Sequence, residues 1–288
     1  MAKTKEIRQR IKAVKNTAKI TKAMQLVAAS KMKRAQDTAL QGRPYAILLR
    51  RILALLNGQA GEFKHPFLEE REVKTRGILL VSTDRGLCGP LNSNLFRELV
   101  KIDGEKAFVT VGKKGTQFVS RTGRKLLASF SIAEGVPFNE VRPIAEFMLE
   151  QFMEGHIDTI EVLYPRFRNT LIQEPTLMPL LPLTNLKKAV EANAKAMGEE
   201  LAHDNREFIF EPDATTILDK LMDRFFKQQV FQLILDSRAS EHSSRMVAMK
   251  AATDNAKKLT DDLTLQFNKA RQAAITQEIL EITAAANM

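Results

Sequence analysis

Tryptophan is absent from this chain of 288 residues, and cysteine occurs once, as Cys88. A single cysteine excludes an internal disulfide framework and a zinc site built from several cysteines. No run approaches the roughly 18 uninterrupted apolar residues of a membrane-spanning helix. The opening MAKTKEIRQRIK lacks the apolar core of a secretory signal, and its pattern continues into a predicted helix, which disfavours a transit peptide. We therefore expect a cytosolic protein.

Glycine and proline are absent after Pro212, so the last 76 residues contain no helix breaker. A helical pattern much longer than about 25 residues indicates a coiled coil, a membrane span or a helical repeat. Apolar and small residues recur here in steps of four and three, as in a heptad seam. The seam consists of Leu235, Ala239, His242, Met246, Met249, Thr253, Ala256, Thr260, Leu263, Phe267, Ala270 and Ala274. We predict a C-terminal coiled-coil helix within residues 208–288, capped by Asp213.

Residues 1–57 predict a second long helix with a seam of its own, and we expect a kink at residues 42–44, where its only breakers lie. The seam consists of Ile7, Ile11, Val14, Ala18, Thr21, Gln25, Ala28, Met32, Ala35 and Ala39. Antiparallel pairing of the two helices would bury both seams. The C-terminal helix is longer by about 20 residues, so its end should project by about 30 Å beyond its partner.

Between the helices, residues 74–183 alternate short β-rich runs with helical ones. The expected strands are 76–82, 106–112, 125–132, 158–167 and 171–183, the last an edge strand because of its prolines. The expected helices are 91–101, 113–122 and 139–155. This alternation predicts βαβ units and an inserted, Rossmann-like α/β domain with a mainly parallel sheet. A polar linker is expected at 184–207, so the fold class is α/β with long helices.

The positive charge is concentrated at the N-terminus. The chain carries a net charge of +10, but residues 1–51 hold fourteen lysines and arginines against two acids, which is +12. The remainder is therefore −2. Such asymmetry points to an acidic partner, for which nucleic acid, an anionic membrane and an acidic protein surface all qualify.

No constellation of residues indicates catalysis. The strand–loop–helix at 78–96 has the right context for phosphate binding, but it contains neither G-x-G-x-x-G nor G-K-[ST]. Cys88 has no histidine near it in sequence, and the four histidines show no metal-ligand spacing. His242 lies on the helical seam, where an interfacial role is favoured over a ligand. We predict a non-enzymatic chain without a cofactor.

Four stretches resemble one family closely. They are IRQRIKAVKNTAKITKAMQLVAASKM (7–32), STDRGLCGPLN (82–92), SSRMVAMKAATDNA (243–256) and ITQEILEI (275–282). They look like the gamma subunit of bacterial F-type ATP synthase, and the resemblance extends over essentially the whole chain. It implies the rotor shaft of that complex. The shaft turns inside a ring of three alpha and three beta subunits and stands on the membrane c-ring beside the epsilon subunit, at the cytoplasmic face of the cell membrane.

The resemblance also implies which residues meet partners. It places the following near acidic loops of the beta subunits: Ile20, Lys22, Met24, Asp84, Arg85 and Cys88. It places two residues in contact with the catalytic ring higher up: Arg245 and Gln277. The sequences FIFEPD (208–213) and GRPY (42–45) are expected to face the c-ring.

Two other functional classes compete with this one. A basic helix joined to a heptad rod is also typical of a DNA-binding zipper, which requires the basic region to continue into a parallel dimer seam. Here the charge and the seam share the same residues, and the α/β insertion would have no role, so we predict no nucleic-acid partner. A free-standing α/β enzyme is the other class, and the missing catalytic set argues against it.

Overall fold

A computed structural model describes residues 2–59, 65–69, 71–183 and 213–286. The chain divides into two compact units. The first joins residues 1–30 to residues 245–288, and the second comprises residues 31–244. The predicted linker 184–207 and most of FIFEPD lie outside the described residues.

The first unit is a pair of helices from opposite ends of the chain. They are the N-terminal part of α1 (Ala2–Gln59) and the C-terminal part of α6 (Ala214–Ala286). The Thr21 and Thr253 hydroxyls lie 2.7 Å apart, and the Arg8 guanidinium lies 5.3 Å from the centre of the Phe267 ring. Because the contact moves up one helix as it moves down the other, the pair is antiparallel, as predicted.

Burial confirms both predicted seams. All ten members of the α1 seam are half-buried or buried, whereas Lys12, Lys15 and Lys19 between them are exposed. Ala28 is only 2% exposed and Thr253 only 4%. Small residues at these positions let the two backbones approach closely, so the pair holds together with little apolar bulk.

The longer helix overhangs its partner in the first unit. α6 has 73 residues and α1 has 58. The register of the Thr21 and Thr253 pair puts the beginning of α1 opposite residues 272 and 273 of α6. Residues 274–286 therefore have no facing residue of α1, an overhang of about 20 Å. This is shorter than the 30 Å expected, because α6 exceeds α1 by 15 residues (73 less 58) rather than by about 20.

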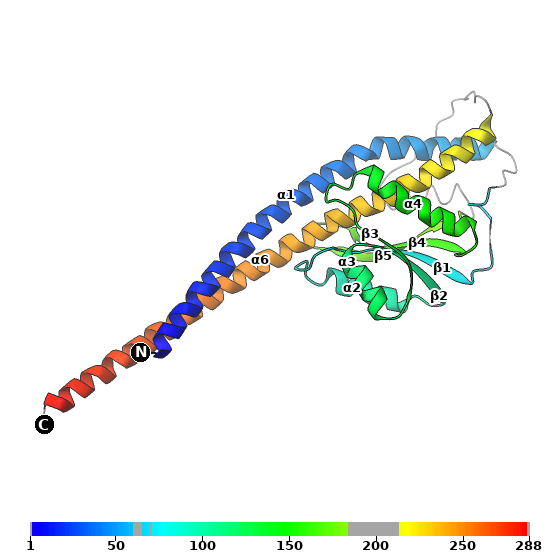
Figure 1. Ribbon diagram of the computed structural model, residues 1–288. Coiled ribbons are helices and arrows are strands. Elements are labelled where there is room, and N and C mark those ends of the chain that lie inside the picture. Colours follow the sequence, from blue (N-terminus) through cyan, green and yellow to red (C-terminus); the bar gives the residue numbers. More distant parts are fainter. Residues whose placement is uncertain (1, 60–64, 70, 184–212, 287–288) are drawn as a thin grey trace. The chain divides into compact units, whose positions relative to one another are not determined.

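The second unit contains a five-stranded sheet (Figure 1). Its strands are β1 (Thr75–Val81), β2 (Glu105–Val111), β3 (Lys125–Phe130), β4 (Thr159–Phe167) and β5 (Gln173–Leu181). Their order is β3-β2-β1-β4-β5, with the first four parallel and β5 antiparallel at the edge. The mainly parallel sheet and its proline-bearing edge strand confirm the sequence prediction.

Helices cover both faces of this sheet. Ile78 and Leu80 of β1 pack against α2 (Leu91–Lys101) and α3 (Lys113–Arg121). Leu79 and Val81, which alternate with them, face a larger core built with α4 (Phe138–Met153) and α6. This alternation explains why β1 reads as a continuous apolar run. The strand order reverses beside β1, where the chain crosses from one face of the sheet to the other.

The second unit also includes parts of both long helices. Leu49 and Leu53 of α1 belong to the same core cluster as Leu218 and Met222 of α6. α1 continues through Pro44, so the breakers at residues 42–44 do not end the helix. The packing of the second half of α1 stabilises the helix by more than the loss of the one hydrogen bond that proline removes.

Candidate partner interface

The loop between β1 and α2 is held by hydrogen bonds at both ends. Thr83 Oγ1 donates to the Arg85 carbonyl at 2.7 Å, and Asn92 Nδ2 donates to Thr83 Oγ1 at 2.8 Å. From α6, Ser244 Oγ donates to the Cys88 carbonyl at 2.6 Å. The loop is therefore fixed to two helices rather than left to vary.

The N-terminus of α3 is satisfied by the same loop. The Lys113 amide donates to Asp84 Oδ1 at 3.2 Å, the next amide donates to the Thr83 carbonyl, and the Gly115 amide donates to Ser82 Oγ at 2.7 Å. In doubly wound folds, ligands bind at this edge of the sheet, and helix N-termini hold phosphate. Here those amides are already bonded within the chain.

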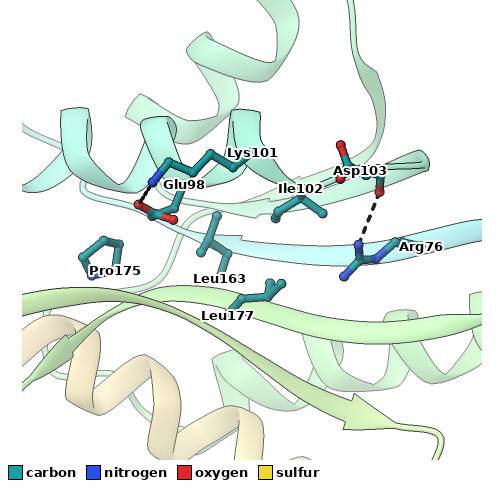
Figure 2. A pocket seen from close by; sticks show the side chains of 8 residues that line it. All are labelled: Arg76, Glu98, Lys101, Ile102, Asp103, Leu163, Pro175 and Leu177. Carbon is teal, nitrogen blue, oxygen red and sulfur yellow. Dashed lines mark hydrogen bonds and ion pairs between the residues drawn. The ribbon is translucent and has the colours of Figure 1, made fainter.

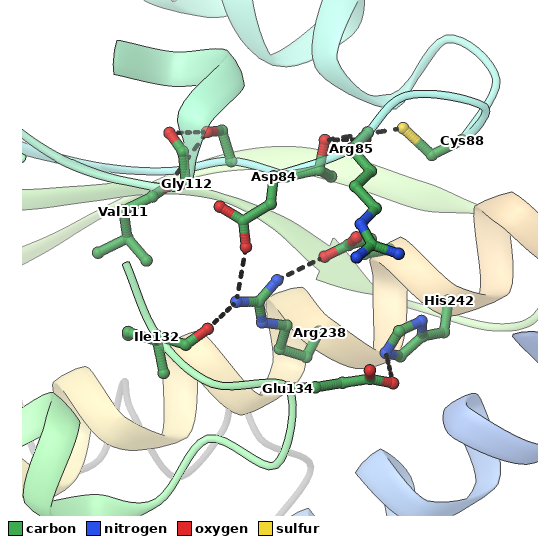
Figure 3. A network of polar contacts seen from close by, with 12 residues as sticks. Asp84, Arg85, Cys88, Val111, Gly112, Ile132, Glu134, Arg238 and His242 are labelled. Atoms are coloured by element: carbon green, nitrogen blue, oxygen red, sulfur yellow. Dashed lines mark hydrogen bonds and ion pairs between the residues drawn. The ribbon is translucent and has the colours of Figure 1, made fainter. Parts of the chain in front are cut away.

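Arg238 of α6 joins this loop to a second one (Figure 3). Its Nη2 contacts Asp84 Oδ2 at 3.4 Å and donates to the Ile132 carbonyl at 3.0 Å, while Nη1 donates to Glu241 Oε2 at 2.9 Å. The Arg238 side chain is 8% exposed and that of Glu241 is 7% exposed. A buried guanidinium with three oxygen acceptors is well compensated for its lost hydration.

Glu134 lies at the rim of this cluster, between the two long helices of the second unit. Lys31 Nζ of α1 donates to its carboxylate at 2.7 Å, and His242 Nε2 of α6 lies 3.9 Å from it. The hydrogen bond from Lys31 holds the pKa of Glu134 below its ordinary value. His242 is 6% exposed, in keeping with the interfacial role predicted for it.

The three site residues predicted in the loop do not share one environment. Arg85 is exposed, the Asp84 side chain is 26% exposed, and Cys88 is 3% exposed. Leu87, which the sequence analysis passed over, is 62% exposed and has a positive φ of 62°. Its place beside Gly86 was the only signal available, since an apolar residue in a glycine-rich turn often points outward. The exposed side chains of the loop tip are thus Arg85 and Leu87.

The predicted residues on α1 in the first unit differ in exposure. Ile20 is 61% exposed, Lys22 is exposed and donates to Gln25 Oε1 at 3.3 Å, and Met24 is half-buried. Leu26 and Val27, which were not predicted as site residues, are 59% and 53% exposed. The basic stretch therefore carries an apolar surface as well as charge.

Arg245 and Gln277 are not parts of one site. Both belong to α6, and their separation of 32 residues corresponds to about 48 Å along a helix. Arg245 is half-buried where α6 is paired with α1, and Gln277 is exposed on the overhang.

Comparison with known proteins places the chain in a family. A family model described as ATP synthase matches residues 3–288. The ATP synthase gamma chain of Opitutus terrae is 53% identical over 99% of this chain and 98% of its own length. The chain belongs to the ATP synthase gamma chain family.

Solved structures share its fold. The central stalk of the Tetrahymena thermophila mitochondrial ATP synthase is 26% identical, with a TM-score of 0.60 over 81% of this chain and 99% of that chain. The rotor of the Euglena gracilis mitochondrial ATP synthase is 16% identical, with a TM-score of 0.66 over 95% of this chain and 99% of that chain. The second likeness is one of fold alone.

Surface hollows lie among the described residues of the second unit of this family member. One, of about 300 Å³, lies beside α2 and has Ile102, Leu163 and Leu177 near its floor and Arg76 and Lys101 near its rim (Figure 2). Another, of about 350 Å³, lies between α1 and α6. It is lined by apolar side chains with two cations, and includes Tyr45 of the predicted GRPY sequence, which is 49% exposed.

Within the described ranges, no three histidine, cysteine or acidic side chains gather as metal ligands would. None of the helices described there is long and apolar enough to span a membrane. The last residue of FIFEPD, Asp213, accepts the Thr216 amide at 2.8 Å and so caps α6 as predicted.

Proposed function

We propose that this chain is the central rotor shaft of a proton-translocating F-type ATP synthase. It has no catalytic site of its own and carries torque between a membrane c-ring and a catalytic ring of alpha and beta subunits. The observation that carries the proposal is the first unit. A continuous antiparallel pair of helices with an overhanging end is a stiff rod that can reach into another assembly. Because the chain belongs to the gamma chain family, we infer that this assembly is the catalytic ring of ATP synthase.

A rotor shifts a neighbouring subunit between conformations only if its contacts favour one of those conformations over the other. The first unit has unlike sides for this purpose. Lys12, Lys15, Lys19 and Lys22 form an exposed basic surface on α1. On the overhang of α6, Ile275 and Ile279 are 47% and 55% exposed. A neighbour with an acidic loop at the height of these lysines would face them over only part of a rotation.

The predicted contacts divide into three groups in this proposal. Ile20, Lys22, Met24 and Arg85 present side chains to the beta subunits, and Leu87 joins them. Asp84 and Cys88 act from inside, by holding the loop that carries Arg85. Arg245 and Gln277 meet the catalytic ring at two different heights. The overhang sits in a socket formed by that ring, since a lone helix end in water is marginal.

The foot of the shaft belongs to the second unit. The hollow containing Tyr45 pairs apolar residues with Lys220 and Arg224, and suits a mixed apolar and acidic partner surface. We assign this region to the epsilon subunit and the c-ring. The chain would thus be peripheral, at the cytoplasmic face of the inner membrane, and serve ion transport without crossing the bilayer.

Purification of a tagged chain from its own membranes tests the proposal. We expect alpha and beta subunits at three copies each per chain, together with epsilon and the c-ring. A second preparation, with Lys15, Lys19 and Lys22 all changed to glutamate, should retain these partners but pump protons poorly during ATP hydrolysis. Recovery of the wild-type chain alone, or with nucleic acid, would overturn the proposal.

A further inference from the structure

A nine-residue stretch of α6 reaches three separate loops of the second unit. We define the polar collar as Asp236, Arg238, Glu241, Ser243 and Ser244. Arg238 contacts the β1–α2 loop at Asp84 and the segment after β3 at the Ile132 carbonyl. Ser244 donates to the Cys88 carbonyl at 2.6 Å.

The collar also reaches the connection between β4 and β5. Ser243 Oγ donates to the Thr170 carbonyl at 2.8 Å, and Asp236 Oδ2 accepts the Phe167 amide at 3.1 Å. All three loops follow the carboxyl ends of parallel strands. The collar therefore holds the segments that follow three of the four parallel strands from a single helix.

The rest of the contact between α6 and the sheet is of a different kind. Residues such as Met222, Phe226 and Ile234 are almost completely buried in the large apolar core. Apolar burial is non-directional, so it specifies the register of α6 less sharply than hydrogen bonds and ion pairs do. Buried charges and hydrogen bonds, in contrast, require one geometry and are costly to leave unmade.

We propose that the polar collar, centred on Arg238, fixes the rotational register of α6 against the sheet. Rotation applied to the α/β part of the second unit then passes into the long helix without slip. Arg238 is a positioning residue in this inference, because it acts through the loops that it holds. The inference rests on the proposed function for its link to torque, but the fixing of register can be measured without it.

Amide hydrogen exchange of the purified full chain tests the fixing of register. We expect Arg238→Met to accelerate exchange in residues 83–92 and in residues 131–137 by at least about tenfold. The control is Arg76→Met. Arg76 makes a bidentate pair with Glu161 at 2.7 and 2.8 Å, but this pair lies on the sheet face covered by α2 and α3. The control should leave exchange in both segments unchanged.

Two milder variants keep the test decisive if Arg238→Met does not fold. Asp84→Asn retains an acceptor for the Lys113 amide while removing the charge that faces Arg238, and Ser244→Ala removes one hydroxyl. Each should accelerate exchange in residues 83–92. Unchanged amide exchange in Arg238→Met, Asp84→Asn and Ser244→Ala would overturn the inference, whether or not the chain is a rotor.

The assembled complex tests the link to torque. In inverted membranes, we expect the ratio of ATP-driven proton pumping to ATP hydrolysis to fall to about half in Arg238→Met, because a slipping joint wastes rotation against a load. Arg238→Lys keeps the charge but loses the guanidinium fork, and should be intermediate. Faster exchange with an unchanged pumping ratio would overturn the role in torque. Failure of the wild-type chain to assemble would instead refute the proposed function.

Discussion

At the scale of single residues, Met24 has an unusual position. It is half-buried on a helix whose neighbouring residues Ile20, Leu26 and Val27 are more than half exposed. Methionine is unbranched and polarisable, so it accommodates changing neighbours. That property suits a surface that slides past several partners in turn.

We expect Met24→Lys to weaken energy coupling more than hydrolysis. An added cation beside an acidic loop would form an ion pair at one angle only, worth about 1–3 kcal/mol when partly buried, and would deepen one rotational well. The measurement is ATP-driven proton pumping alongside ATPase activity, with Met24→Leu as control. Equal coupling ratios in wild type and both variants would contradict this interpretation.

His65 is expected to make the stability of the second unit depend on pH. Its Nδ1 accepts the Phe67 amide at 3.1 Å, so Nε2 carries the proton and donates to Asp219 Oδ1 at 3.1 Å. Burial lowers the pKa of His65, and its contacts with Asp219 oppose that effect without cancelling it. The folded protein thus binds this proton less readily than the unfolded chain.

The stability that neutral, buried His65 contributes to the fold is therefore present above the ordinary histidine pKa of about 6.5. It is lost as the pH falls below that value, because the unfolded chain binds the proton more readily. We expect the melting temperature of the wild type to drop more steeply between about pH 7.5 and about pH 5.5 than that of His65→Gln, which cannot titrate. His156→Gln is the control, since the His156 side chain is 61% exposed. Parallel curves for all three proteins would count against the assignment.

The sequence supplied candidate residues but not their surroundings. Asp84, Arg85 and Cys88 were all predicted as partner-binding residues from one motif, yet only Arg85 has an exposed side chain. The difference comes from Arg238 and Ser244, which lie about 150 positions later in the chain. No local pattern links residues so far apart, so the inward role of Asp84 emerges only from the fold.

At the scale of elements, small side chains on the heptad seams let the two long helices approach closely. Ala28 is 2% exposed in the paired part of α1, where a larger side chain has no room. Ala23, five positions earlier on the same helix, is exposed. The two alanines differ only in the face of the helix on which they lie.

We expect Ala28→Leu to lower the free energy of unfolding by about 1–3 kcal/mol through overpacking. Ala23→Leu should change it by less than about 0.5 kcal/mol, because a surface substitution has little to displace. Denaturant unfolding of the purified chain measures both. A leucine at position 28 that stabilised the protein would show that the helices are not in close contact there.

The elements themselves were largely predictable. The apolar run of β1 and the periodicity of α2 and α4 gave their positions within a few residues. The run of α1 through Pro44 agrees with the helix predicted over residues 1–57, although local propensity opposes a helix at proline. Packing of Leu49 and Leu53 against the core decides the outcome. The predicted N-terminal helix, residues 1–57, ends within two residues of the end of α1.

At the scale of the whole molecule, the overhang of α6 extends past the beginning of α1 and so has no facing residue of that helix among the residues that the structure describes. Its exposed apolar side chains include Ile275, Ile279, Leu280 and Ile282. A helix end that packs on nothing contributes little to stability. The proposed socket in the catalytic ring would cover these apolar side chains.

We expect removal of residues 275–288 to shift the melting temperature of the isolated chain by less than about 2 °C. The same truncation should weaken retention of alpha and beta subunits in the purified complex. Differential scanning calorimetry and quantitative subunit analysis provide the two measurements. A large loss of thermal stability would show that the overhang folds back on the chain.

The pairing of Thr21 with Thr253 has a consequence for biosynthesis. The two residues are 232 positions apart, and ribosomes add roughly 5–20 residues per second, so α1 waits on the order of 10–50 s for its partner. During that interval its seam is exposed to solvent and to other macromolecules. A seam made of alanine, threonine and glutamine at its centre offers little apolar surface to other nascent chains. The composition that permits close packing in the finished shaft thus also protects the helix while it is unpaired.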